Sequence, residues 1–246
     1  MKKRLLVVGA HPDDESFWCG GTLVRLAEQC VQIHVLSATS GQAGECGDPP
    51  VCRPDELGAV REAELRCACR TIGAEPPIIL DYWDGKLAEV SDEEGIREVL
   101  DVMLATRAQI LLTWPPDGGS GHPDHIAACR WATAAFERSH AWGNEAPVAL
   151  YYMVRTKSVA ALLQRKNPPG VPDNAVDVRV DIMPVWGKRM AALHCHRSQM
   201  NSSILRAPLE LQQAVFGWET FCRGGQRPGS DWFDHLLQCP HPVPHQ

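Results

Sequence analysis

The sequence lacks several features that mark large classes of protein. No window approaches the ~18 consecutive apolar residues of a membrane-spanning helix. No run of five like charges occurs and the net charge is −6, so a nucleic-acid-binding surface is not expected. No G-x-G-x-x-G follows the first apolar run, which argues against a dinucleotide site. Without an internal repeat or a recognisable linker, residues 1–246 are expected to form a single domain.

We also do not expect a secretory signal peptide. Residues 2–4 are basic, but only the six residues 5–10 are apolar, whereas a signal peptide needs ~7–15. The ten cysteines therefore favour reduced thiols in a cytoplasmic protein over a disulfide framework. Neighbours such as Cys67 and Cys69 point apart on a helix, which favours buried thiols over a second metal site.

The sequence does contain short apolar runs that alternate with segments of helical spacing. The runs predict five strands, at residues 5–10, 32–36, 78–80, 109–114 and 148–154. This alternation predicts right-handed βαβ units, hence an α/β fold with a Rossmann-like parallel sheet and helices on both faces. If the strand order is 3-2-1-4-5, the ligand-binding crevice lies between strands 1 and 4.

The C-terminal third predicts a small extension of this fold. Residues 177–182 alternate like a strand with one solvated face, and residues 185–198 predict a helix. From about residue 224 to 246, glycine and proline predict a weakly ordered tail. The loop 39–54 contains three glycines and three prolines. It is too long for a simple connection, and loops of this kind are often functional.

Two motifs rich in histidine and aspartate follow the first and fourth apolar runs, HPDDE at 11–15 and GHPDH at 121–125. The predicted topology brings them together. His11 and Asp14, at i and i+3, and His125 would form a three-ligand set that leaves one position for water. That is the pattern of a catalytic zinc site, whereas structural zinc sites have four ligands. The sequence therefore predicts one Zn²⁺ per chain.

The other residues of the two motifs can supply acid and base groups. Asp13 suits the base that activates the water, and His122 suits the oxyanion or the leaving group. Asp124 is the candidate carboxylate that would keep His122 protonated. An alternative for Asp124 is a plain helix N-cap, and for the acidic turn at 13–15 a stabilising role at a helix start. Together the motifs predict hydrolysis of an amide.

The same residues resemble a known family. HPDDE after an N-terminal strand, GGT at 20–22 and HPDH before a helix are similar to the PIG-L/LmbE-like zinc-dependent N-deacetylases. The resemblance implies the same zinc ligands, base and acid that the motifs predict from their chemistry. It also implies a hydrolase that removes an N-acyl group from a small amino-sugar substrate such as an N-acetylglucosaminyl compound.

Three residues are candidates for substrate contacts. Arg61 and Glu45 lie in segments that resemble the family, and Ser120 stands where some relatives have a tyrosine. For Arg61, an ion pair with Glu62 or Glu64 on a solvated helix face is an alternative. The late motif at 196–199 is similar to a family motif, and hydrogen bonds at a helix end are its other interpretation.

Two other functions remain open at this point. One is an amidase that acts on a thiol conjugate, and the other is a binding protein that kept the pocket without turnover. Many members of the resembled family form oligomers, so a homo-oligomer is also open, although no segment of the sequence indicates an interface.

Overall fold

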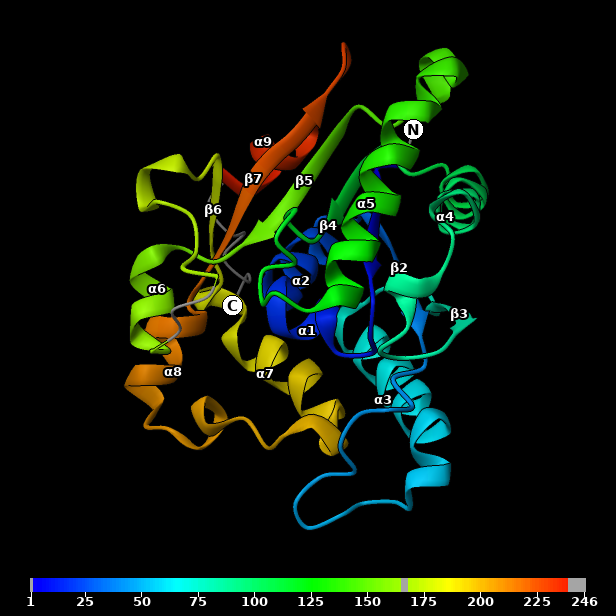
Figure 1. Ribbon diagram of the computed structural model, residues 1–246. Coiled ribbons are helices and arrows are strands. Elements are labelled where there is room, and N and C mark those ends of the chain that lie inside the picture. The colour runs from blue at the N-terminus through cyan, green and yellow to red at the C-terminus, as the bar shows by residue number, and fades with distance from the viewer. Residues whose placement is uncertain (1, 165–167, 239–246) are drawn as a thin grey trace.

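The structure is a computed structural model that describes residues 2–164 and 168–238. A seven-stranded sheet runs through it in the order β3-β2-β1-β4-β5-β7-β6 (Figure 1). The strands are β1 Arg4–Gly9, β2 Gln32–Thr39, β3 Ile78–Tyr82, β4 Ile110–Thr113, β5 Ala149–Val154, β6 Val178–Asp181 and β7 Trp218–Gln226. The first five are parallel to one another, so the predicted order 3-2-1-4-5 is confirmed.

Helices cover both faces of the sheet (Figure 1). The α-helices of the described residues are α1 Asp14–Trp18, α2 Gly20–Glu28, α3 Leu57–Ile72, α4 Asp92–Thr106, α5 Pro123–Arg138, α6 Lys157–Leu162, α7 Trp186–Cys195, α8 Leu209–Phe216 and α9 Trp232–Gln238. On one face α4 packs against α5; on the other, α2 contacts α3, α7 and α9. The central strand β1 is therefore covered twice, and Leu5, Leu6 and Val7 have no exposed surface.

The C-terminal extension differs from the prediction in two ways. The predicted strand at 177–182 is present as β6, but it pairs antiparallel with β7, which the sequence does not reveal. β7 is hard to recognise because it buries a charge: Glu219 is only 5% exposed and accepts hydrogen bonds from the backbone N–H groups of Gly21 and Thr22. β7 also pairs antiparallel with β5 and thereby extends the parallel sheet.

The weakly ordered tail predicted from about residue 224 is also wrong for residues 224–238. Residues 224–226 belong to β7, and residues 232–238 form α9. Phe233 is fully buried, with its ring centroid 4.7 Å from Tyr151 and 5.2 Å from Phe221. This aromatic contact anchors the helix despite the glycine and proline before it. Residues 239–246 lie outside the described residues.

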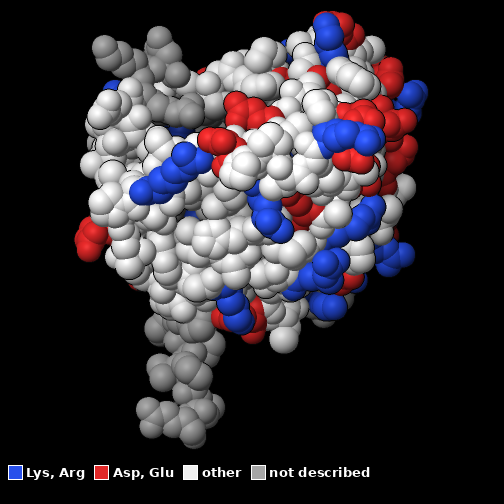
Figure 2. All heavy atoms as spheres, turned by 90° about the horizontal axis from the view of Figure 1, so that it is seen from below, with Lys and Arg blue, Asp and Glu red and all other residues white. Residues whose placement is uncertain are grey.

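One cysteine pair departs from the expected reduced thiols. Cys67 of α3 and Cys195 at the end of α7 form a disulfide. Cys67 does point away from Cys69 along its own helix, as expected, but it points at a helix 128 residues further along the chain. No helix in the described ranges has the length and apolar character needed to cross a bilayer. On the face shown in Figure 2, Lys and Arg side chains are interspersed with Asp and Glu.

The contact between α4 and α5 depends on a glycine, which has no side chain. A Cβ atom at Gly95 would lie 2.2 Å from the ring of Trp131, which is buried and donates a hydrogen bond to Asp92. The ring cannot retreat easily, and overpacking of this kind typically costs about 1–3 kcal/mol. Gly95 therefore fixes the distance between α4 and α5.

We predict that Gly95→Ala lowers the free energy of unfolding by about 1–2 kcal/mol, because overpacking exceeds the gain in helix propensity of up to ~1 kcal/mol. The control is Gly187→Ala on α7, where an added Cβ meets nothing within 4 Å. That variant should be as stable as the parent or slightly more so. Urea denaturation of both variants checks this, and equal stability would contradict the packing argument.

Candidate active site

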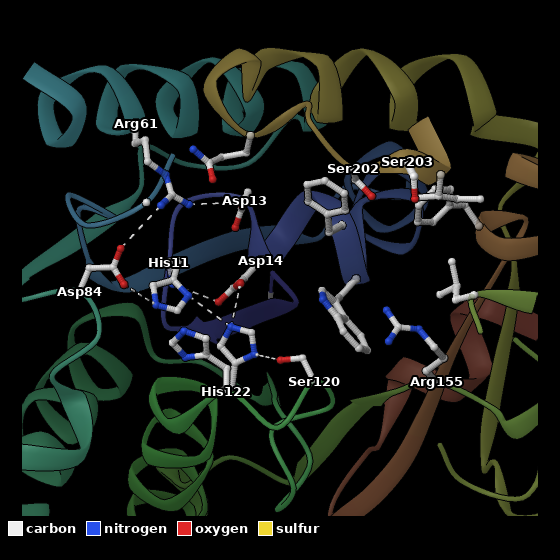
Figure 3. A pocket seen from close by; sticks show the side chains of 18 of the residues that line it. His11, Asp13, Asp14, Arg61, Asp84, Ser120, His122, Arg155, Ser202 and Ser203 are labelled. Carbon is white, nitrogen blue, oxygen red and sulfur yellow. Dashed lines mark hydrogen bonds and ion pairs between the residues drawn. The ribbon is translucent and has the colours of Figure 1, made fainter. Parts of the chain in front are cut away.

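A cavity of about 500 Å³ opens at the carboxyl ends of the parallel strands. At one end it is lined by His11 from the turn after β1, by Asp14 at the start of α1 and by His122 at the start of α5 (Figure 3). His125 of α5 also lines the cavity. These two segments are more than 100 residues apart in the sequence, yet β1 and β4 are neighbours in the sheet. The two predicted motifs therefore meet at the edge where the strand order reverses.

Three side chains of the motifs converge on one point. Ligand atoms of His11, Asp14 and His125 all lie within 4.8 Å of one another. His11 Nδ1 is 3.2 Å from His125 Nε2, which is 3.5 Å from Asp14 Oδ1. Two imidazole nitrogens and one carboxylate oxygen are a donor set that suits a divalent cation, zinc in particular.

Asp14 is held so that one oxygen remains directed at this point. Its Oδ2 accepts hydrogen bonds from the backbone N–H groups of Ala10 and His11 at 2.7 and 3.0 Å. It also accepts one from Trp114 Nε1 at 3.2 Å. Because Oδ2 is occupied in this way, Oδ1 is the oxygen that faces His125.

The tautomer of His125 is fixed by the partners of its Nδ1 atom. Nδ1 lies 3.1 Å from the carbonyl oxygen of Gly118 and 3.0 Å from Ser120 Oγ. An N–H at Nδ1 satisfies the carbonyl and leaves the lone pair on Nε2. Burial, reinforced by the neighbouring His11, lowers the pKa of His125 to about 3, so the ring is neutral and available as a ligand.

His11 is oriented by two carboxylates. Its Nε2 lies 3.0 Å from Asp84 Oδ1 and 3.1 Å from Asp124 Oδ2. Burial alone would lower the pKa of His11, but the hydrogen bonds to Asp124 and Asp84 raise it to about 10. With that pKa the ring carries a proton on both nitrogens at neutral pH. A bound cation would replace the proton on Nδ1, while the Nε2–H group still donates to the carboxylates. The residues present therefore fit a bound metal ion.

The carboxylate of Asp124 is hydrogen-bonded to His11 and to the loop after β3, and not to His122, the partner that the sequence predicts. Its carboxylate accepts hydrogen bonds from the backbone N–H groups of Gly85 and Leu87 at 2.7 and 3.1 Å, and it contacts His11. It meets His122 through the backbone, where the Asp124 N–H donates to His122 Nδ1 at 3.1 Å. Because His122 is the N-cap of α5, Asp124 is the second residue of the helix. Its side chain turns toward the loop after β3.

Asp13 lies beside His11 and Asp14 in a strained conformation. Its φ of 125° lies in a region that residues other than glycine rarely adopt. The backbone is held by its N–H, which donates to Glu15 Oε2 at 3.2 Å. Burial raises the pKa of Asp13 to about 6, while Arg61 opposes the rise, with Nη2 3.3 Å from Asp13 Oδ2.

Arg61 is buried, unlike the solvated residue that one interpretation proposed. It donates to the carbonyl oxygens of Gly41 and Pro12 at 2.9 and 2.6 Å. Its ion pairs are with Asp13 and Asp84, at 3.3 and 3.8 Å. Arg61 thus ties the loop after β2 to the turn that carries Asp13, and it also lines the cavity.

The other two candidates for substrate contacts lie in different places. Ser120 lines the cavity beside His125. Glu45 is outside the set of described residues that line it; its carbonyl oxygen accepts from Gln199 and its carboxylate from Asn201. Glu45 therefore joins the loop 39–54 to the segment after α7, and a direct substrate contact is better supported for Ser120.

One residue of the site and two buried pairings around it escape the sequence analysis. Asp84 follows the third apolar run at the same edge of the sheet, a position that could have drawn attention to it. Glu15 and His196 form a buried pair, with Oε1 2.8 Å from Nε2. Glu64 accepts hydrogen bonds from both the backbone N–H and the hydroxyl of Ser198. These pairs are separated by more than 100 residues, so no local pattern predicts them.

Comparisons with known proteins identify the family of this chain. Residues 6–136 match the family model described as PIG-L: GlcNAc-PI de-N-acetylase. The protein named 1D-myo-inositol 2-acetamido-2-deoxy-alpha-D-glucopyranoside deacetylase from Actinosynnema mirum is 32% identical, over 80% of this chain and 81% of its own. Its namesake from Streptomyces griseus is 31% identical, over 80% of this chain and 75% of its own.

Two solved structures show the same fold. N,N'-diacetylchitobiose deacetylase from Pyrococcus horikoshii has a TM-score of 0.69 and 19% identity, over 90% of this chain and 83% of its own. The 4-carboxy-2-hydroxymuconate hydratase GalB from Pseudomonas putida has a TM-score of 0.67 and 20% identity, over 94% of this chain and 99% of its own. Because the fold serves both reactions, it does not by itself define the chemistry. The family model covers more than half of the 246-residue chain, and this protein therefore belongs to the PIG-L family.

Proposed function

We propose that this protein is a metal-dependent hydrolase that removes the acetyl group from the nitrogen of a small N-acetylglucosaminyl compound. The observation that carries the proposal is the convergence of His11, Asp14 and His125 beside Asp13 in a cavity large enough for a small glycoside. The relatives named as deacetylases of an inositol glycoside of N-acetylglucosamine support an amino sugar as the substrate.

The proposed metal is zinc, one ion per chain, held by His11, Asp14 and His125. When bound, it would lower the pKa of a water molecule toward ~7 and polarise the acetamide carbonyl. Asp13 takes the proton from the attacking water. With a pKa of about 6, this carboxylate is ionised at neutral pH, yet basic enough to accept a proton and return it to the leaving amine.

His122 is the group proposed to stabilise the negative charge on the acetamide oxygen. Its Nδ1 accepts the backbone N–H of Asp124, so a neutral ring carries its proton on Nε2. The residue lines the cavity, with its ring centroid 5.0 Å from that of His125. His122 can therefore donate a hydrogen bond without being positively charged, and it needs no carboxylate partner for this role.

The direct test is release of acetate from 1D-myo-inositol 2-acetamido-2-deoxy-α-D-glucopyranoside by the zinc-loaded protein. We expect turnover that a chelator abolishes and added zinc restores. A parallel set of cysteine-amide conjugates tests the alternative of a thiol-conjugate amidase. Metal binding without hydrolysis of any N-acyl compound would overturn the proposal and favour a binding protein.

Replacing the proposed base should separate catalysis from metal binding. We predict that Asp13→Asn lowers kcat by about 10²–10⁴-fold but keeps the zinc content of the parent, because the ligands are untouched. Asp101→Asn on the exposed face of α4 is the matched control and should be fully active. Acetate release and metal analysis check both variants. An Asp13→Asn protein with parental kcat would remove Asp13 from the base role.

The orientation of Asp124 leads to a prediction that distinguishes the role of Asp124 from that of His122. Asp124→Asn should weaken zinc affinity by about 10–100-fold, because the carboxylate supports a ligand. His122→Ala should instead lower kcat while zinc affinity stays close to that of the parent. Competition with a fluorescent chelator measures the affinities. If Asp124→Asn lowered only kcat, as His122→Ala does, a pairing with His122 would be supported instead.

A further inference from the structure

The peptide group that precedes Asp13 is held at both of its polar atoms. The carbonyl oxygen of Pro12 accepts a hydrogen bond from Arg61, and the N–H of Asp13 donates to Glu15 Oε2 at 3.2 Å. The orientation of this peptide sets the φ angle of Asp13, whose value of 125° is costly for a residue with a side chain. Such a conformation persists only where its surroundings enforce it, and Glu15 is part of what enforces it.

Glu15 is buried, and both of its carboxylate oxygens are occupied. Oε2 accepts the Asp13 N–H, whereas Oε1 accepts the hydroxyl of Ser16 at 2.5 Å and lies 2.8 Å from His196 Nε2. His196 has no exposed surface. Burial alone would lower the pKa of His196, but the contact with Glu15 raises it, so the two side chains form an ion pair.

His196 is fixed to helix α3 through its neighbours in the chain. Cys195 forms the disulfide with Cys67, and the backbone N–H and hydroxyl of Ser198 donate to Glu64 at 2.8 and 2.6 Å. The imidazole is therefore anchored to α3, although it belongs to the segment that follows α7.

The pair of Glu15 and His196 is a poor device for stability alone. A buried ion pair seldom contributes more than apolar side chains of similar volume. The Nδ1 atom of His196 is also buried without a hydrogen-bond partner in the part of the chain that the structure describes, which costs free energy. Strained and unsatisfied groups cluster at functional sites, and here they lie next to the proposed base.

We propose that Glu15 and His196 are positioning residues that hold the backbone of Asp13, so that its carboxylate stays in place to take a proton from the attacking water. The inference rests on the proposed function. Both residues are outside the set of described residues that line the cavity, so they act through Asp13 and not on the substrate. Their loss should therefore lower kcat, while KM and zinc affinity stay close to those of the parent.

The kinetic test replaces both partners, because removing one alone would leave the other buried and unpaired. The double variant Glu15→Leu/His196→Leu should lower kcat by about 10–100-fold, the loss expected for a hydrogen bond to a charged group. His196→Gln supplies an amide N–H in place of Nε2–H and should retain most of the parental kcat. Acetate release from the inositol glycoside gives kcat and KM, and competition with a fluorescent chelator gives the zinc affinity.

The control is Tyr151→Phe, which removes a hydrogen bond from a buried hydroxyphenyl ring to Asp231, away from the residues that line the cavity. It should lower the melting temperature and leave kcat unchanged, and so shows what a loss of stability alone does. A parental kcat in the double variant would overturn the inference. So would a fall in kcat that is accompanied by a comparable loss of zinc affinity or a comparable rise in KM.

A second measurement needs no turnover and separates this inference from the proposed function. Glycine adopts a φ of 125° without strain, so Asp13→Gly relieves the parent fold. In the double variant Asp13 is no longer held at this angle, and the same substitution has no strain to relieve. The loss of the Arg61 contact is common to both backgrounds and cancels.

The change in melting temperature caused by Asp13→Gly should thus be more favourable in the parent than in the double variant, by about 2–4 °C. Equal changes in the two backgrounds would overturn the inference. Unequal changes in a parent protein that releases no acetate would overturn the proposed function and still support Glu15 and His196 as the residues that hold Asp13.

Discussion

The carboxylate of Asp14 is the interaction on which the rest of the site depends. One of its oxygens accepts N–H groups from the end of β1 and from the indole of Trp114. Gly9 leaves the room for this, since a Cβ there would lie 3.1 Å from the same oxygen. Trp114 in turn stacks on His125. A single buried carboxylate therefore fixes the turn after β1, a residue after β4 and the plane of a ring on α5.

Buried charge elsewhere in the site is compensated in the same manner. Asp84 and Asp124 share the N–H of His11, and Arg61 spans Asp13 and Asp84. An ionised group in a protein interior is stable only when it is paired and its remaining hydrogen bonds are made. Asp84 and Asp124 meet that condition through partners from other elements, whereas Arg61 Nε is buried without a hydrogen-bond partner among the described residues. The network is stiff as a result, which suits a site that must hold a cation and a base at fixed separation.

The cavity combines two regions of different origin. The end with His11 is built from the turns after β1 and β4, which the two motifs encode. The end with Arg155 is built from the residue after β5, from α8 and from the segment at 202–204. The two ends of the cavity are therefore built from different segments of the chain.

The sequence by itself determined the parallel part of the sheet and the meeting of the two motifs. Buried strands are recognisable as short apolar runs, and the switch-point rule places His11 next to His125 without any knowledge of side chains. Only the tertiary structure decided what Asp124 faces, because its direction depends on how α5 begins and on the loop after β3. The same holds for Phe233 in α9 and for the disulfide between Cys67 and Cys195. Their partners lie far along the chain, and local periodicity contains no information about such contacts.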